Sequence, residues 1–105
     1  MLNTLINILG IGSKPNFSEL LKEGAMIIDV RTKREFETGH IPGSRNIPLD
    51  TLPVHLKKLG DKQAAIITCC ASGMRSASAR NLLKSAGFER VYNGGGWKNL
   101  NNKLK

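Results

Sequence analysis

Residues 64–86 read AAIITCCASGMRSASARNLLKSA, and the hydrophobic pattern changes halfway along them. The first six residues are an almost unbroken apolar run, which predicts a β-strand over Ala64–Cys69 that is buried on both faces. A loop of small residues, Cys70–Met74, follows, and Arg75–Ala86 has the pattern of a helix that ends at Gly87. A buried strand joined by a short loop to a helix is the unit from which parallel sheets are built.

The rest of the chain repeats this alternation of strands and helices. Further strands are expected at Ala25–Val30, around Asn46–Ile47 and at Arg90–Tyr92, and further helices at Asn16–Glu23, Thr32–Thr38, Asp50–Leu59 and Trp97–Leu104. Helices that connect strands by short loops cover a parallel sheet on both faces. The prediction is therefore a single α/β domain with a mostly parallel sheet and helices on both faces.

Two of the expected helices carry recognisable start signals. Thr32 is a favourable N-cap, and Glu35 three residues later completes a capping box, with Phe36 expected to face the core. Asp50 is expected to cap the next helix, in which Pro53 is tolerated in the first turn.

Residues 1–15 are expected to form an N-terminal segment that packs on a domain of residues 16–105. Four apolar side chains share one face of a predicted helix in this segment: Leu2, Leu5, Ile6 and Leu9. The apolar stretch is interrupted by polar residues and is shorter than the roughly 20 residues that a membrane span needs. It also lacks the preceding basic residue and the cleavage site of a signal peptide. We therefore expect a cytoplasmic protein that does not bind membranes.

The charge balance indicates an anionic partner. Sixteen Lys and Arg residues against eight Asp and Glu give a net charge of +8, which attracts anions. The basic residues are scattered along the chain, and there is a single Trp and a single Tyr. Nucleic-acid platforms combine clustered basic residues with stacking aromatic side chains, so this pattern favours a small anionic substrate over nucleic acid.

The cysteines and histidines argue against structural cross-links. Cys69 and Cys70 are adjacent, and neighbouring residues are too close together for an ordinary disulfide. His40 and His55 have no ligand spacing with the thiols, so no metal site is expected.

Cys70 is the candidate nucleophile. It lies at the predicted carboxyl end of a parallel strand, where such folds form their ligand crevice. If the loop curls into a semicircle, its amide N–H groups and the helix N-terminus converge on one point and can bind an anion. The candidate anion-binding residues are Ala71, Ser72, Gly73, Met74 and Arg75. A cysteine in such surroundings ionises more readily than a free thiol, and the Arg75 guanidinium suits oxyanions.

Cys69 is expected to play a different part. Side chains alternate between the two faces of a strand, so Cys69 and Cys70 should point in opposite directions although they are adjacent. Cys69 then behaves as a small apolar core residue and not as a resolving thiol.

Four ordered signatures resemble the rhodanese family, the single-domain sulfurtransferases, over residues 17–100. They are DVR at 29–31 with EF at 35–36, GHIPGS at 39–44 with NIP at 46–48, CASGMRS at 70–76, and VYNGGGW at 91–97. The resemblance implies a parallel sheet of about five strands and a persulfide on Cys70. A donor such as thiosulfate would leave its outer sulfur on Cys70 and depart as sulfite. An acceptor, which is cyanide in vitro and a thiol, including a protein thiol, in the cell, would then remove that sulfur without any metal or organic cofactor.

Four further polar residues of these signatures are expected to support the site structurally. Asp29 and Arg31 at the end of a strand, with Glu35 close by, are more plausible as hydrogen-bonding residues that hold loops than as proton-transfer groups. His40, beside the Pro-Gly turn, is assigned the same structural role.

Two alternatives to a sulfurtransferase remain at this stage. Phosphatases and arsenate reductases of a similar fold use a Cys-x5-Arg loop, which matches a count from Cys69 to Arg75, whereas the count from Cys70 is Cys-x4-Arg. Thr68 stands where that group typically has a histidine, which weakens this match. The second alternative is a non-catalytic binding module, although such domains usually lack the cysteine that is present here.

Overall fold

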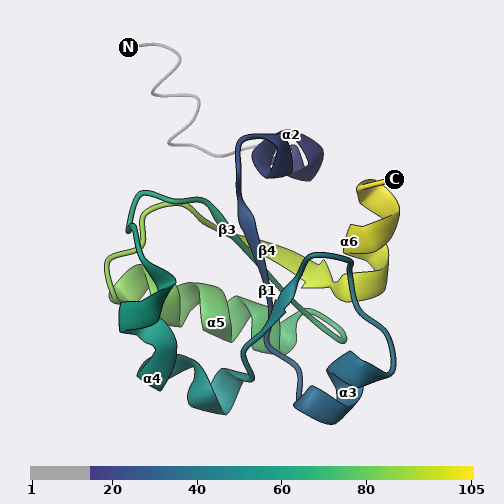
Figure 1. The fold of residues 1–105 in the computed structure, drawn as a ribbon, viewed down its shortest axis with the longest axis horizontal. Helices are drawn as coiled ribbons and strands as arrows, with labels where there is room; N and C mark the ends of the chain where they lie inside the picture. The colour runs from purple at the N-terminus through teal and green to yellow at the C-terminus, as the bar shows by residue number, and fades with distance from the viewer. Residues whose placement is uncertain (1–14) are drawn as a thin grey trace.

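Four parallel strands form the sheet of the computed structural model, which describes residues 15–105 (Figure 1). In the order β2-β1-β3-β4 across the sheet, they are β2 (Arg45–Asn46), β1 (Met26–Asp29), β3 (Ile66–Cys70) and β4 (Val91–Gly96). The predicted α/β fold with a parallel sheet is confirmed. Within residues 15–105 the sheet has four strands, whereas the family resemblance implies about five. The helix predicted near the N-terminus and the packing of segment 1–15 on the domain lie outside the described residues.

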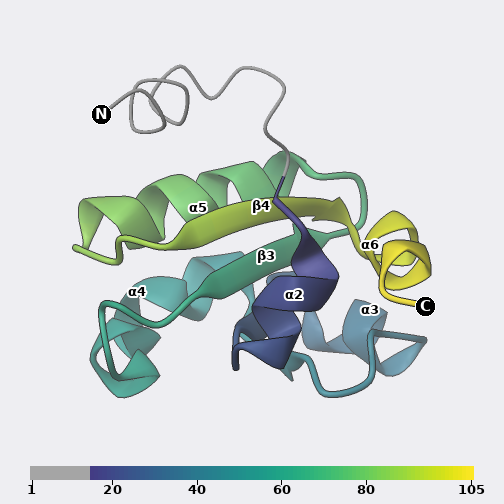
Figure 2. The same cartoon turned by 90° about the horizontal axis from the view of Figure 1, so that it is seen from above.

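Helices cover both faces of the sheet, as predicted. The α-helices are α2 (Phe17–Lys22), α3 (Lys33–Glu37), α4 (Leu52–His55), α5 (Met74–Ser85) and α6 (Trp97–Lys103). One apolar core joins the sheet to α4 and α5, and it contains Ile28, Ile66, Leu52, Leu83 and Phe88. The other core joins the opposite face to α2 and α6, and it contains Ile27, Ile67, Phe17, Leu20 and Leu100. The helix α5 runs along β3 and β4 (Figure 2). None of the helices in residues 15–105 has the length and apolar character needed to cross a bilayer.

An irregularity interrupts the pairing of β3 with β4 at the carboxyl end of the sheet. Thr68 pairs with Asn93, whereas Cys70 pairs with Gly96, so two steps along β3 match three steps along β4. The extra residue in β4 is a β-bulge, a feature that re-aims side chains near functional sites. It lies directly beside Cys70.

The capping box predicted at Thr32 is confirmed. Thr32 Oγ1 accepts the Glu35 N–H at 3.2 Å, and Glu35 Oε1 accepts the Thr32 N–H at 3.0 Å. This reciprocal pair fixes the start of α3 immediately after β1. Phe36 was expected to face the core, but it is only half-buried and stacks on the His40 ring with 3.7 Å between ring centroids.

The single helix predicted from Asp50 to Leu59 is wrong. The segment consists of a 3₁₀ turn η1 (Leu49–Thr51), the short helix α4, and a second 3₁₀ turn η2 (Leu56–Leu59). Pro53 lies in the first turn of α4, where its missing N–H is tolerated as predicted. The apolar residues Leu49, Leu52, Leu56 and Leu59 are spaced three or four apart, a spacing that fits short 3₁₀ turns as well as an α-helix. The N-cap of α4 is Thr51 and not Asp50, and no side chain caps it.

The fourth strand is longer than predicted. It was expected to end at Tyr92, but β4 continues through the three glycines to Gly96. Glycine usually weakens a strand, and here it is used because the neighbouring backbone is too close for side chains. A Cβ at Gly94 would lie 2.8 Å from the Thr68 carbonyl oxygen, and one at Gly96 would lie 2.9 Å from that of Ala71.

Candidate active site

Cys70 ends β3, and its sulfur is held by backbone N–H groups. The Gly73 N–H donates to Cys70 Sγ at 2.9 Å, and the Ser76 N–H donates at 3.3 Å. The residue as a whole is 1% exposed, so the protein supplies these donors in place of water. An anionic sulfur at this position is stabilised by two N–H dipoles in surroundings of low polarity.

The loop after Cys70 brings two backbone N–H groups onto the cysteine sulfur. Of the predicted residues Ala71 to Arg75, Gly73 is the one whose N–H contacts Cys70 Sγ, and the second donor is Ser76, which was not predicted. Ser76 is the third residue of α5, and the first N–H groups of a helix have no partner within the helix. That rule could have identified Ser76 from the sequence.

The remaining loop residues are open to solvent. Ala71 and Ser72 are exposed, and the Met74 side chain lies at the surface with 80% exposure. Gly73 adopts φ +106°, a left-handed conformation that side chains disfavour, and this conformation turns its N–H toward Cys70. A ligand can therefore reach the loop from the outside, above the buried sulfur.

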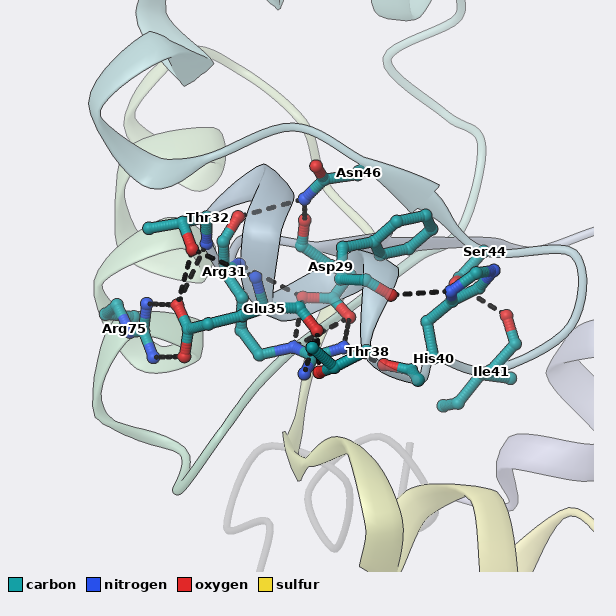
Figure 3. A network of polar contacts seen from close by, with 12 residues as sticks. Asp29, Arg31, Thr32, Glu35, Thr38, His40, Ile41, Ser44, Asn46 and Arg75 are labelled. Carbon is teal, nitrogen blue, oxygen red and sulfur yellow. Dashed lines mark hydrogen bonds and ion pairs between the residues drawn. The ribbon is translucent and has the colours of Figure 1, made fainter.

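Arg75 forms a bidentate ion pair with Glu35, which lies 40 residues earlier in the chain (Figure 3). Its Nη1 and Nη2 lie 2.7 and 2.9 Å from the two carboxylate oxygens of Glu35. The pair joins the start of α5 to α3, so it anchors one side of the cysteine loop. Because Glu35 neutralises the guanidinium, Arg75 presents less positive charge to a ligand than the sequence suggested.

This ion pair predicts a specific dependence of stability on pH. Donation from Arg75 and from the Thr32 N–H holds the pKa of Glu35 at about 2, below its usual 4.5. The resulting stabilisation is fully present above about pH 4.5 and is lost as the pH falls toward about 2. We expect the free energy of unfolding of the wild type to fall more steeply across this range than that of Glu35→Gln, as measured by urea titration. Glu37→Gln, on the same helix, should keep the wild-type slope, and parallel curves for Glu35→Gln and wild type would contradict the prediction.

Asp29 and Arg31 form a buried polar centre beside the loop. Arg31 Nη2 lies 2.7 Å from Asp29 Oδ2, and Arg31 also donates to the carbonyl oxygens of Glu35 and Gly39. The guanidinium lies 4.8 Å from the ring centroid of Trp97, which ties α6 to the same centre. These two residues hold the chain segments around the site.

His40 lies apart from this centre. In Figure 3 it is on the opposite side of Asp29 and Arg31 from Arg75. Its Nδ1 contacts the Phe36 carbonyl oxygen at 2.8 Å, at the end of α3. This contact joins His40 to the last turn of α3 and involves no residue of the cysteine loop.

Cys69 points away from the loop. It belongs to the core formed with α2 and α6, whereas Cys70 belongs to the core formed with α4 and α5. Cys69 is fully buried, and this burial raises the pKa of its thiol to about 12. It is held as a neutral thiol at physiological pH.

A hollow of about 360 Å³ lies against the start of α5. It is lined by Val30, Thr32, Pro48, Leu49, Asp50 and Arg75. Its walls are largely apolar, and Arg75 of α5 contributes to its lining.

Comparison with known proteins places this geometry in a family. The family model for the rhodanese-like domain matches residues 13–103. The protein YqhL of Bacillus subtilis is 38% identical over 82 residues, which are 77% of this chain and 64% of that protein. Thiosulfate sulfurtransferase GlpE of Ectopseudomonas mendocina is 36% identical over 74 residues, which are 70% of this chain and 67% of that enzyme. The chain thus spans about two thirds of the length of these curated relatives.

A solved structure agrees over a larger part of the chain. The rhodanese-like domain protein of Staphylococcus aureus superimposes with a TM-score of 0.66 at 33% identity, covering 92% of this chain and 83% of that one. Since the family model spans nearly the whole chain, and since these relatives agree with it in sequence and in fold, the chain belongs to the rhodanese-like domain family.

Proposed function

We propose that this protein is a sulfurtransferase that carries a sulfane sulfur on Cys70 between a donor and an acceptor. The observation that supports this most strongly is the contact of Cys70 Sγ with the N–H groups of Gly73 and Ser76 at the start of α5. Such donors stabilise both a thiolate nucleophile and the anionic persulfide formed from it.

The proposed reaction has two steps. In the first, the Cys70 thiolate attacks the outer sulfur of thiosulfate, the sulfur–sulfur bond of the donor breaks, and sulfite leaves with the electron pair of that bond. In the second, a thiophilic acceptor attacks the outer sulfur of the persulfide and the Cys70 thiolate is released. Cyanide gives thiocyanate in this step, and a thiolate gives a new persulfide. The relative GlpE is named a thiosulfate sulfurtransferase, which supports thiosulfate as the first donor to test.

The exposed N–H groups of the cysteine loop are proposed to bind the donor. Arg75 adds less charge than its position in the sequence suggests, because Glu35 holds both of its terminal nitrogens. In our proposal Arg75 mainly maintains the curvature of the loop and offers its Nε–H to the donor. The hollow between Leu49 and Arg75 provides room for a group attached to the transferred sulfur.

The alternative that Cys69 begins a phosphatase-like loop has less support. Its thiol faces the core on the other side of the sheet and is fully buried, with a pKa of about 12. A phosphatase nucleophile must be ionised and open to the substrate. The two N–H donors that contact Cys70 Sγ likewise favour an enzyme over a binding module.

Intact mass spectrometry tests the proposal. The protein should gain one sulfur atom, about 32 Da, on incubation with thiosulfate, and should lose it again on addition of cyanide or a thiol. Hydrolysis of an aryl phosphate without any gain of sulfur would support the phosphatase alternative instead.

Cys69→Ala should leave sulfur transfer within about twofold of the wild-type rate, because Cys69 acts as a small core residue. Thiocyanate formation from thiosulfate and cyanide measures that rate. A variant that still loads one sulfur but no longer turns over would identify Cys69 as a resolving thiol.

A further inference from the structure

A chain of buried side-chain hydrogen bonds lies directly behind Cys70. Thr68 from β3, Ser76 from α5 and Asn93 from β4 meet there. The two hydroxyl oxygens of Thr68 and Ser76 are 2.7 Å apart, and Ser76 Oγ lies 2.5 Å from Asn93 Oδ1. Thr68 and Ser76 are both fully buried.

The direction of these hydrogen bonds is set by the groups available. Asn93 Oδ1 can only accept, so the Ser76 hydroxyl donates to it. Because the one Ser76 hydroxyl proton is used there, Thr68 is the donor toward Ser76. Its proton is shared between Ser76 Oγ at 2.7 Å and the Ser76 carbonyl oxygen at 3.0 Å, with the Tyr92 carbonyl oxygen at 3.4 Å. Asn93 Oδ1 also accepts the Gly95 N–H at 2.9 Å. These hydrogen bonds therefore run in one direction, from the Thr68 hydroxyl through the Ser76 hydroxyl to the Asn93 side-chain oxygen.

These hydrogen bonds reach one of the two residues whose N–H groups hold the Cys70 sulfur. Ser76 itself provides one of them, at 3.3 Å from Sγ. Gly73 provides the other, and a Cβ at Gly73 would lie 3.5 Å from the Cα of Gly95, the residue that Asn93 fixes. The side chains of Thr68 and Asn93 thus hold Ser76, one of the two donors, relative to the end of β3, and Gly73 packs beside the Gly95 backbone that Asn93 fixes.

We propose that Thr68, Ser76 and Asn93 are positioning residues that set the reactivity of Cys70 by holding the Ser76 N–H group against its sulfur. The inference rests on the proposed role of Cys70 as a nucleophile, and it adds residues that do not themselves touch a substrate. A purely structural role makes a different prediction, because removing one partner of a buried hydrogen bond then lowers the stability of the domain and leaves the reactivity of Cys70 in the folded protein unchanged.

Thr68 offers a matched pair of substitutions for the test. Thr68→Val keeps the shape of the side chain and removes the hydroxyl, whereas Thr68→Ser keeps the hydroxyl and removes the methyl group. The full-length proteins are treated with iodoacetamide at pH 7 without any sulfur donor. The rate of Cys70 alkylation is followed by fragmentation mass spectrometry, which distinguishes Cys70 from Cys69.

We expect Thr68→Val and Ser76→Ala to lower the alkylation rate of Cys70 about three- to tenfold, the range covered by loss of one hydrogen bond. Thr68→Ser should react at close to the wild-type rate. Ser18→Ala, which removes the α2 hydroxyl that donates to the Lys103 carbonyl oxygen of α6, is the control and should also react like the wild type.

Three results would overturn the proposal. One is equal alkylation of Thr68→Val and wild type, and another is equal impairment of Thr68→Ser and Thr68→Val. The third is a lower Cys70 alkylation rate in Thr68→Val that becomes equal to the wild-type rate once both rates are corrected for the fraction of folded protein. If Ser76→Ala does not fold, the Thr68 pair still provides the answer. Because no sulfur donor is used, failure of the wild type to load sulfur from thiosulfate would count against the proposed function and not against this inference.

Discussion

Cys70→Ser should abolish sulfur transfer while the fold is retained. The serine hydroxyl is nearly isosteric with the thiol and can still accept from the Gly73 N–H, so the loop has no reason to rearrange. A hydroxyl at this position is far less ionised than a thiolate and forms no persulfide. Thiocyanate production should fall to the uncatalysed rate, and the gain of about 32 Da on incubation with thiosulfate should disappear.

Cys69→Ala is the matched control, since it removes the neighbouring thiol and leaves Cys70 in place. Circular dichroism and thermal unfolding of both variants check that the domain is folded. Wild-type turnover by Cys70→Ser would end the sulfurtransferase proposal. If the Cys69→Ala variant is folded but takes up no sulfur, the nucleophile is Cys69 and not Cys70.

Asp29→Ala should be the most destabilising of the substitutions considered. The Asp29 side chain is fully buried, and its carboxylate is the acidic partner of Arg31, whose side chain is 4% exposed. Removing one partner leaves a buried guanidinium charge without compensation, which costs about 3–5 kcal/mol. For a domain of this size the melting temperature should fall by more than about 10 °C.

Glu23→Ala provides the comparison, because it breaks an ion pair of the same type at the surface. The Glu23–Arg90 pair has a longer separation of 3.2 Å and is exposed on both sides. Its loss should cost less than about 1 kcal/mol. Urea titrations of the two variants measure the difference, and equal losses would show that the Asp29–Arg31 pair is hydrated in the folded protein.

Local patterns in the sequence were sufficient for most of the fold. Apolar runs such as Ala64–Cys69 predict buried strands because a strand covered on both faces buries every one of its side chains. The Thr32–Glu35 capping box was correct since both partners lie within one helical turn and need nothing else to form. The segment from Asp50 to Leu59 was predicted incorrectly as one helix, because leucines spaced three or four apart fit 3₁₀ turns as well as an α-helix and do not fix the hydrogen-bond pattern.

The candidate site could be predicted only in part. The place of Cys70 follows from the order of strand, loop and helix, and the divergence of Cys69 follows from strand alternation. The partner of Arg75 does not follow from any local pattern, because Glu35 is 40 residues away and is brought to it by the packing of α3 against the start of α5. The sequence therefore suggested a free guanidinium where the folded protein has an ion pair.

The three segments behind Cys70 are likewise joined only in the folded protein. Thr68, Ser76 and Asn93 are unremarkable in the sequence, and each is the type of residue that is often found at a surface or in a turn. They form one hydrogen-bonded chain because the parallel register brings β3 beside β4, and the glycines of β4 allow its backbone to approach the cysteine loop. Hydrogen bonds act over about 3 Å, so they depend on which distant segments touch, and only the tertiary packing sets those contacts.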